Sequence, residues 1–587
     1  MSTDILPRPA PALPNFIWRL FDRRNILPFL LAFVLGVGIL APMAKIAWQT
    51  VATDGFTVWQ EVIASDISRS LLWRPLTNTM LIGALTVIGT LAIGGFLAWL
   101  VVLTNVPYRK LIGTLAALPF VIPSFASAFA WGVVFRNDKV GGSIGWIQAA
   151  GIPVPDWLAW GMFPTTTVLI LHYSSLVFLL VAAALASVHS DMIEAANMTG
   201  ASRSRVIGGI VLPVVTPAIV SSASLVFAGA VSNFAAPALM GLPVNMHTLS
   251  TRLFGMISTG NTERGYVLAL ILIAISAAAL WWANRAVTGR RSFATVTGKG
   301  GRTKRFELGS WAWPLCAIAL LIGLISTVAP LFVLLASSVT KEIGSFSAGF
   351  TLHYWIGLSD PAIAQGIGGV LRDAQTLKAL GITLALGACV AVVSLTIGLM
   401  TAYVTTRLKT SPLAAPLGTL TFLPAMVPGI AFGAGYIALF GQSWGPIPAL
   451  YGTFTLLVIA GAAYTLPFAV QSARACMAQV SGDIEDAATL AGASLPRRMW
   501  SIYFPLTIRG LLAGAVLVIV KMIRDLSLVV LLFTPAMPIL SVVAYRYASE
   551  GFLQHANAIT ALITFISMTA TILAEKLQGA SQPWAKD

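Results

Sequence analysis

Long stretches of apolar, uncharged residues dominate this 587-residue chain and limit it to a membrane fold. About 20 helical residues are needed to cross the roughly 30 Å of hydrocarbon in a bilayer. Six such stretches lie in the first half, at about 26–47, 77–104, 111–135, 163–188, 213–238 and 265–284. Six more lie in the second half, at about 311–337, 379–405, 414–440, 448–473, 506–533 and 555–575. Because a backbone in lipid must satisfy its own hydrogen bonds, they predict an all-α polytopic membrane protein with about twelve transmembrane helices.

The composition agrees with this prediction. Hydrophobic residues make up 57% of the chain and charged residues only 10%, which is far from the globular norm. The net charge of +15 would suit a nucleic-acid partner, but the lysines and arginines lie in short clusters beside the apolar stretches. This placement follows the positive-inside rule, so we expect the bilayer and no nucleic acid as a partner. The scattered Cys316, Cys389 and Cys476 predict neither a disulfide framework nor a metal site.

The charge pattern divides the chain into four regions. A basic tail (1–25) precedes a first membrane domain (26–284), and a linker with seven basic residues (285–310) precedes a second membrane domain (311–587). The basic segments predict that the tail, the linker and the C-terminus are cytoplasmic. Because six spans is an even number, both domains enter the membrane from the same side and form two parallel six-helix repeats.

One motif occurs in both domains at an offset of 492 − 200 = 292 residues. The first copy reads Glu194-Ala195-Ala196, three residues, Gly200, nine residues, and Ile210-Val211-Leu212-Pro213; the second reads Asp486-Ala487-Ala488, three residues, Gly492, nine residues, and Ile502-Tyr503-Phe504-Pro505. Asp483 is placed to cap the second copy's first helix, and each glycine is expected to end that helix in a left-handed conformation. We interpret each copy as a water-exposed helical hairpin that docks a partner, the first hairpin at 194–212 and the second hairpin at 486–504.

Other landmarks repeat as well. Gly94 corresponds to Gly398, and a proline pair at 119 and 123 corresponds to a pair at 424 and 428. The proline offset of 424 − 119 = 305 exceeds 292 by 13 residues, which we place in an outer loop around 141–160. Each proline pair predicts either a hinge or a kink fixed by packing.

The repeated motif resembles the cytoplasmic motif of permease subunits in binding-protein-dependent ATP-binding-cassette importers. The second copy departs from it only mildly, at Asp486 and Phe504. The resemblance implies that each hairpin is a coupling hairpin, whose first helix contacts an ATPase subunit. By this resemblance the ATPase-coupling residues are Glu194, Ala195, Ala196, Gly200, Asp486, Ala487, Ala488 and Gly492.

The resemblance further implies a fused two-half permease, most similar to the ferric-iron permease group, in a bacterial inner membrane. The chain itself is then not an enzyme and needs no cofactor, and the sequence contains no Gly-x-x-x-x-Gly-Lys-[Ser/Thr] motif for ATP. ATP and magnesium are expected on the partner ATPase, in two copies, and a periplasmic binding protein is expected to deliver the solute.

Ionisable residues inside membrane spans are costly and are therefore candidates for function. Arg524 and Asp525 lie in the eleventh stretch, and Ser232 and Asn233 occupy the corresponding region of the fifth. If the two domains are related by a pseudo-two-fold axis, these four residues face each other across the substrate pathway. The alternative is that Arg524 and Asp525 snorkel to the interface or fix helix packing.

The sequence is compatible with more than one solute and more than one class of membrane protein. The best solute is ferric iron, but 2-aminoethylphosphonate, thiamine and polyamine permeases resemble the chain in the same way. An ion-coupled secondary transporter also has twelve spans in two parallel halves, although it would not explain two identically spaced cytoplasmic hairpins. A membrane scaffold would explain the hairpins but not the internal duplication.

Overall fold

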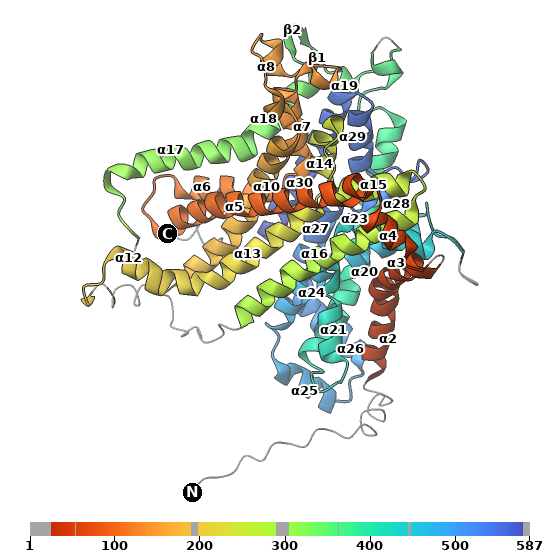
Figure 1. Cartoon of the computed structure of the whole chain (residues 1–587). Helices are drawn as coiled ribbons and strands as arrows, with labels where there is room; N and C mark the ends of the chain where they lie inside the picture. Colours follow the sequence, from red (N-terminus) through yellow and green to blue (C-terminus); the bar gives the residue numbers. More distant parts are fainter. Residues whose placement is uncertain are drawn as a thin grey trace.

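The structure is a computed structural model that describes residues 25–52, 55–188, 196, 198–288, 305–361, 363–443 and 448–578. The predicted N-terminal tail, except Asn25, and residues 289–304 of the predicted linker lie outside this described part. The chain is mostly helical (Figure 1).

The first half comprises α2 (Ile26–Leu35), η2 (Gly36–Leu40), α3 (Ala41–Ala52), α4 (Thr57–Ala64), η3 (Arg69–Trp73), α5 (Arg74–Leu103), α6 (Arg109–Ala117), η4 (Leu118–Phe120), α7 (Ser124–Phe135), α8 (Trp146–Ala149), α9 (Asp156–Ala159), α10 (Met162–Ala186), α12 (Arg203–Val206), η6 (Ile207–Val211), α13 (Leu212–Ser232), α14 (Ala235–Met240), α15 (Leu249–Ser258) and α16 (Thr262–Thr288). The second half comprises α17 (Ala312–Gly323), η9 (Leu324–Val328), α18 (Ala329–Ser338), β1 (Thr340–Glu342), β2 (Ser345–Phe350), α19 (His353–Ile356), α20 (Ala374–Thr406), α21 (Ala414–Leu420), α22 (Leu423–Met426), α23 (Gly429–Phe440), α24 (Phe454–Met477), α25 (Gly482–Leu490), α26 (Leu495–Arg498), η11 (Met499–Tyr503), α27 (Phe504–Ile523), α28 (Val529–Leu532), α29 (Leu540–Ser549) and α30 (Leu553–Gln578).

The helices confirm the predicted spans. In the described part of the chain, ten helices are long and apolar enough to cross a membrane, and two bent pairs raise the number to twelve if each pair is one span. Two predicted spans are shorter than expected, because α13 ends at Ser232 and α27 ends at Ile523. In both, the chain turns at the polar residues that follow and continues into a short helix, α14 or α28.

The two bent pairs are the predicted proline pairs. The helix ending at Phe120 meets α7 at 98°, and the helix ending at Met426 meets α23 at 108°. Proline lacks a backbone N–H and disfavours a helical conformation in the residue before it, so the helix cannot run through. Ile122 and Val427 are buried at the two breaks. This burial favours the kink fixed by packing over the hinge.

Other prolines leave their helices continuous. Each of the five π-helical turns in the described part is centred four residues before a proline. These turns are η2, η3, η6, η9 and η11, and the prolines are Pro42, Pro75, Pro213, Pro330 and Pro505. A proline ring clashes with the carbonyl four residues earlier, and a wider turn relieves that clash. The prolines of the repeated motif therefore create matching π turns, η6 and η11.

Packing confirms the predicted correspondence of Gly94 and Gly398. A Cβ atom on Gly94 would lie 2.4 Å from the Ser174 carbonyl oxygen, and one on Gly398 would lie 3.0 Å from the Ala469 carbonyl carbon. Both glycines thus allow a close approach of two helices, α5 to α10 in the first half and α20 to α24 in the second. The 13 extra residues also lie where predicted: 26 residues (136–161) separate α7 from α10, and 13 (441–453) separate α23 from α24.

The first span of each half packs on the other half. Leu35 and Ile39 of the first span share a buried cluster with Leu466 and Val470 of α24. In the reverse direction, Cys316 of α17 is buried with residues of α5, α6 and α10. The two halves thus exchange their first spans.

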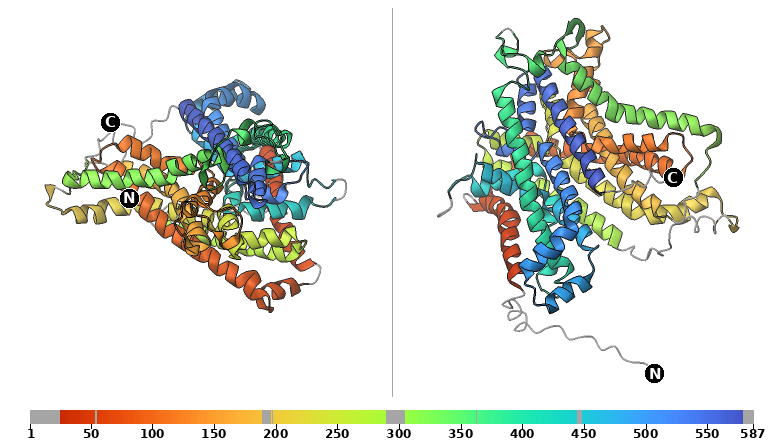
Figure 2. Two further views of the ribbon diagram at one scale, coloured as in Figure 1. Left: turned by 90° about the horizontal axis from the view of Figure 1, so that it is seen from above. Right: turned by 180° about the vertical axis from the view of Figure 1, so that it is seen from behind.

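The two halves lie at a wide angle to each other. Figure 1 shows α5, α10 and α13 running across the view while α20, α24 and α27 run down it. Figure 2 shows the same divergence from behind. Helices α12 and α25 therefore lie apart from each other, and we name the side of the molecule that carries both of them the hairpin end (Figure 1). Helices α7, α14 and α29 meet on the opposite side, which we name the far end (Figure 1).

Candidate functional site

The second hairpin is described completely. Helix α25 ends at Leu490, and Gly492 has a φ of 77°, the predicted left-handed conformation. The Ala493 N–H donates to the Ala488 carbonyl at 3.0 Å, which closes the helix end as a Schellman motif. The predicted cap was wrong: Ser481 is the N-cap, its side chain accepts from the backbone N–H of Asp483, and Asp483 belongs to the first turn. The chain simply enters this helix two residues earlier than expected.

The first hairpin has the same turn. Gly200 has a φ of 78°, and the Ala201 N–H donates to the Ala196 carbonyl at 3.0 Å. Glu194 and Ala195 lie outside the described residues. Where both hairpins are described, their geometry matches residue by residue at the 292-residue offset.

Each hairpin exposes a large apolar side chain two residues before its glycine. Met198 and Leu490 correspond at 490 − 198 = 292, and each is 89% exposed. Asp486, Ala487 and Gly492 are also exposed on the second hairpin. The sequence analysis missed the two apolar residues, although their matching positions before the repeated glycines carry the signal.

A buried carboxylate anchors the second hairpin from beneath. Glu485 is 7% exposed, and its Oε1 accepts hydrogen bonds from Tyr403 Oη at 2.7 Å and Arg498 Nη1 at 3.1 Å. Its Oε2 accepts from Tyr503 Oη and lies 3.7 Å from Arg407 Nε. The sequence analysis missed this cluster, because its members are spread from 403 to 503 and only the fold assembles them.

The first hairpin has an apolar anchor at the corresponding positions. The four residues around Glu485 have counterparts in the first half. Tyr403 and Arg407 correspond to Trp99 and Leu103, and Arg498 and Tyr503 correspond to Val206 and Val211. Leu103, Val206 and Val211 are buried in one hydrophobic cluster, and Trp99 packs against it. The counterpart of Glu485 is Ile193, which lies outside the described residues.

A polar cluster links the two halves near the breaks at Phe120 and Ile523. Arg524 Nη1 donates to the Phe120 carbonyl of the first half, and its guanidinium lies 4.8 Å from the centre of the Phe120 ring. Lys521 Nζ pairs with Asp525 Oδ2 at 3.0 Å and lies 4.9 Å from the centre of the Tyr464 ring. Arg524 thus bonds the second membrane domain directly to the first.

Asn233 and Asp525 play equivalent local roles. Asn233 Oδ1 accepts from the Ala236 N–H at 3.0 Å, and Asp525 Oδ1 accepts from the Leu528 N–H at 2.8 Å. Each side chain thereby holds the turn that leads from the break into the short helix that follows. The backbone carbonyls of the two residues accept from Ser250 Oγ and Ser541 Oγ, which are themselves equivalent.

The candidate pathway residues are only partly brought together. Asn233 Nδ2 donates to Ser124 Oγ at 3.0 Å, next to the break where Arg524 bonds Phe120. Ser232 Oγ donates to the Ala228 carbonyl within its own helix. Their contacts with protein groups agree with a packing role, and a pathway role remains a prediction. In the described ranges, no three His, Cys, Asp or Glu side chains gather into a group that could hold a metal ion.

Comparison with known families identifies the family of this chain. A family model described as binding-protein-dependent transport system inner membrane component matches residues 90–291 and again 394–587. The chain belongs to this family. Because each half matches the model by itself, the chain is a fused two-half permease of a type I ATP-binding-cassette importer. Members of this family work with ATPase and binding-protein partners.

Several relatives of this permease carry more specific names. A ferric transport system permease protein, FbpB, from Actinobacillus pleuropneumoniae is 25% identical over 549 residues, which are 91% of this chain and 76% of the relative. A putative ferric transport system permease protein, FbpB 1, from Haemophilus influenzae is 25% identical over 490 residues, 82% of this chain and 73% of the relative. A putative 2-aminoethylphosphonate transport system permease protein, PhnV, from Salmonella paratyphi A is 24% identical over 251 residues, 42% of this chain and 88% of the relative.

Proposed function

We propose that this permease binds two ATPase subunits, one on each coupling hairpin. The repeated hairpin geometry carries this proposal, because in both halves a left-handed glycine lies two residues after an exposed apolar residue, Met198 or Leu490. Met198 and Leu490 insert into an apolar depression on each ATPase, and Glu194 and Asp486 contact its rim. Ala195, Ala196, Ala487 and Ala488 propagate the docking helices, and Gly200 and Gly492 end them. ATP and magnesium are bound by the ATPase subunits.

The wide angle between the halves supports an alternating-access mechanism. With α12 and α25 apart and the far ends in contact, the arrangement corresponds to an inward-facing state (Figure 1). Closure of the two ATPases on ATP draws the hairpins together and opens the far end towards the binding protein. The Arg524 bond to Phe120 lies between these two ends and must change when the halves rotate.

The membrane orientation follows from the positive charges. Three basic clusters lie at the hairpin end: Arg109 and Lys110 begin α6, Arg407 and Lys409 follow α20, and Arg497 and Arg498 end α26. By the positive-inside rule this end, the linker and both termini face the cytoplasm of a bacterial inner membrane. The far end then faces the periplasm, where a binding protein delivers the solute.

The identity of the solute is the most specific part of the proposal. Ferric iron is the first candidate, since two relatives that cover most of the chain are named for ferric transport. The name of a third relative supports 2-aminoethylphosphonate. Thiamine and polyamines are weaker candidates, supported only by the resemblance of the motif.

ATP hydrolysis tests the proposal. The purified permease in nanodiscs is combined with its ATPase, and the binding protein is added with ferric ion, 2-aminoethylphosphonate, thiamine or a polyamine. We expect one loaded binding protein to stimulate hydrolysis, and native mass spectrometry to find two ATPase subunits per permease. Uptake driven by a proton gradient without any ATPase would replace this proposal with an ion-coupled secondary transporter.

A further inference from the structure

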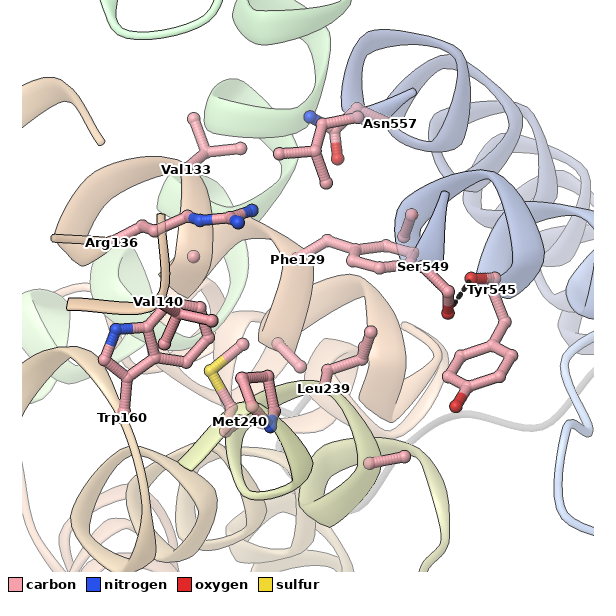
Figure 3. Close-up of a pocket in the computed structure, with 16 residues that line it drawn as sticks. Phe129, Val133, Arg136, Val140, Trp160, Leu239, Met240, Tyr545, Ser549 and Asn557 are labelled. Carbon is pink, nitrogen blue, oxygen red and sulfur yellow. Dashed lines mark hydrogen bonds between the residues drawn. The ribbon is translucent and has the colours of Figure 1, made fainter. Parts of the chain in front are cut away.

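A cavity of about 340 Å³ lies at the far end, between the two halves. Its walls come from α7, α14 and the outer loop of the first half and from α29 and α30 of the second half. Figure 3 shows Arg136 extending into it from one side above Trp160, and Asn557 facing it from the other side. Phe129 and Met240 supply apolar walls. This is the volume and the mixed lining of a small-molecule site.

Arg136 brings a positive charge to this cavity. Its guanidinium lies 5.4 Å from the centre of the Trp160 ring, and its Nη2 donates to the Gly141 carbonyl at 3.2 Å. Its Nε is buried and has no hydrogen-bond partner in the described structure. Burial lowers the pKa of the Arg136 guanidinium from its usual value, as expected for a cation partly withdrawn from water. The nearby carboxylate of Asp156 is already paired, with Lys139 Nζ at 2.6 Å.

The second half supplies the opposite wall. Asn557 is 1% exposed, and its Nδ2 donates to Ser337 Oγ at 2.9 Å. Its Oδ1 is buried and has no partner in the described part of the chain. A buried polar atom without a partner is costly, so a ligand that offers both an anionic group and a donor would stabilise this cavity.

The position of the cavity relative to Arg524 adds a second observation. Helix α7 begins beside Phe120, where Arg524 is bonded, and ends immediately before Arg136. Its 12 residues span roughly 18 Å at a rise of about 1.5 Å per residue. A route along α7 from the far end thus begins and ends at an arginine. Bare ferric ion would be repelled at both points, whereas an anion would be attracted.

We infer that this cavity is the outer receiving site of the pathway and that it binds the oxyanion group of a small solute. Arg136 pairs with the oxyanion through its guanidinium, and Asn557 Oδ1 accepts a hydrogen bond from a donor on the same solute. This inference rests on the proposed function for the direction of transport. A phosphonate, a carboxylate or a sulfate has the required chemistry, and ferric ion fits only within an anionic chelate.

Equilibrium binding to the full-length permease in nanodiscs, without ATPase or ATP, tests this inference. The radiolabelled probes are 2-aminoethylphosphonate, inorganic phosphate, sulfate and ferric citrate, with spermidine as the cationic probe. We expect saturable binding of at least one anionic probe and none of spermidine. Arg136→Gln should weaken that binding at least tenfold, and Arg136→Lys should weaken it less. Lys341→Gln is the matched control, because it removes an exposed positive charge from β1, which does not line the cavity, and should leave binding unchanged.

A second variant keeps the inference testable if Arg136→Gln does not fold. Asn557→Asp places a carboxylate opposite the intact Arg136 and should also abolish anion binding, and thermal unfolding checks that the variant folds. Absence of anion binding to the wild type, equal binding by Arg136→Gln or Asn557→Asp, or saturable spermidine binding would each overturn the inference. ATPase coupling is measured separately, so a permease that binds anions but no ATPase would refute the proposed function and keep this site.

Discussion

The two hairpins share one backbone geometry but are held by different chemistry. In the second hairpin, Glu485 receives hydrogen bonds from two tyrosines and an arginine and lies within ion-pair distance of a second arginine. In the first hairpin, the corresponding positions form a hydrophobic cluster around Val206 and Val211. A buried charge cluster is directional and fixes an orientation, while apolar packing stabilises without fixing direction. The fold therefore repeats the exposed surface of the hairpins and varies what lies beneath it.

The largest effect is expected where the hairpins are identical. In the double variant Gly200→Val, Gly492→Val, each valine must adopt a φ near 78°, at a cost of about 1–3 kcal/mol each. We expect the docking turns to rearrange and ATP-driven uptake to be lost, with the membrane spans still folded. Uptake into proteoliposomes and circular dichroism measure the two results. Gly208→Val is the control, since Gly208 lacks the left-handed φ of the other two glycines and has open space around it. Normal uptake in the double variant would contradict the role of these turns.

The second largest effect concerns the charged anchor. Glu485→Ile leaves Arg407 and Arg498 without their carboxylate and should destabilise the second half by about 3 kcal/mol. Adding Arg407→Leu, Arg498→Val, Tyr403→Trp and Tyr503→Val installs the side chains of the first hairpin's anchor. We expect this fivefold variant to recover most of the lost stability, because well-packed apolar residues can replace a buried charge cluster. Thermal unfolding in detergent measures the stability of the single and the fivefold variant.

A surface pair controls for simple loss of charge. Arg546 and Glu550 lie 3.6 Å apart and are partly exposed, so Glu550→Gln should cost less than about 1 kcal/mol. If Glu485→Ile costs no more than this control, Glu485 is not an anchor and the contrast between the hairpins disappears.

The next effect concerns Met198 and Leu490, the exposed apolar residues that precede the glycines of the two hairpins. The double variant Met198→Ser, Leu490→Ser should weaken ATPase binding by about tenfold, since an apolar side chain buried in an interface is worth at least about 1.4 kcal/mol. Thermal stability should not change, because both side chains are 89% exposed in the free permease. Leu358→Ser, a 72% exposed position away from both hairpins, is the control. Equal ATPase binding by all three proteins would exclude Met198 and Leu490 as docking residues.

The smallest effect concerns the apolar anchor. Val206→Ala removes two methyl groups from a side chain that is 1% exposed and should cost about 1–2 kcal/mol. The exposed Val392→Ala should cost almost nothing. Unfolding at low and high salt sharpens the comparison: the loss from Val206→Ala should not depend on salt. A salt-dependent loss would place charges beneath the first hairpin too.

Much of this fold could be predicted from sequence because local rules decide it. The length of the uncharged stretches identified the spans. The 292-residue repeat identified Gly200 and Gly492 as residues with a left-handed conformation. The difference between two offsets placed 13 extra residues in the correct outer loop. The prediction for Asp483 failed because two neighbouring residues, Ser481 and Asp483, both suit a helix start, and only the chain path selects one.

The tertiary structure decided which apolar surfaces meet. Hydropathy shows that the first span and α17 must leave water, but lipid and protein interior are equally apolar, so it does not show that each packs on the other half. The sequence also does not show the hydrogen-bond partners of Glu485, which lie up to 82 residues away. Nor does it show that Arg524 is bonded to Phe120, which lies 404 residues away. The sequence by itself determined the elements, their order and their repeat, because these depend on neighbours along the chain. Contacts between distant residues depend on three-dimensional packing, and only the folded chain reveals them.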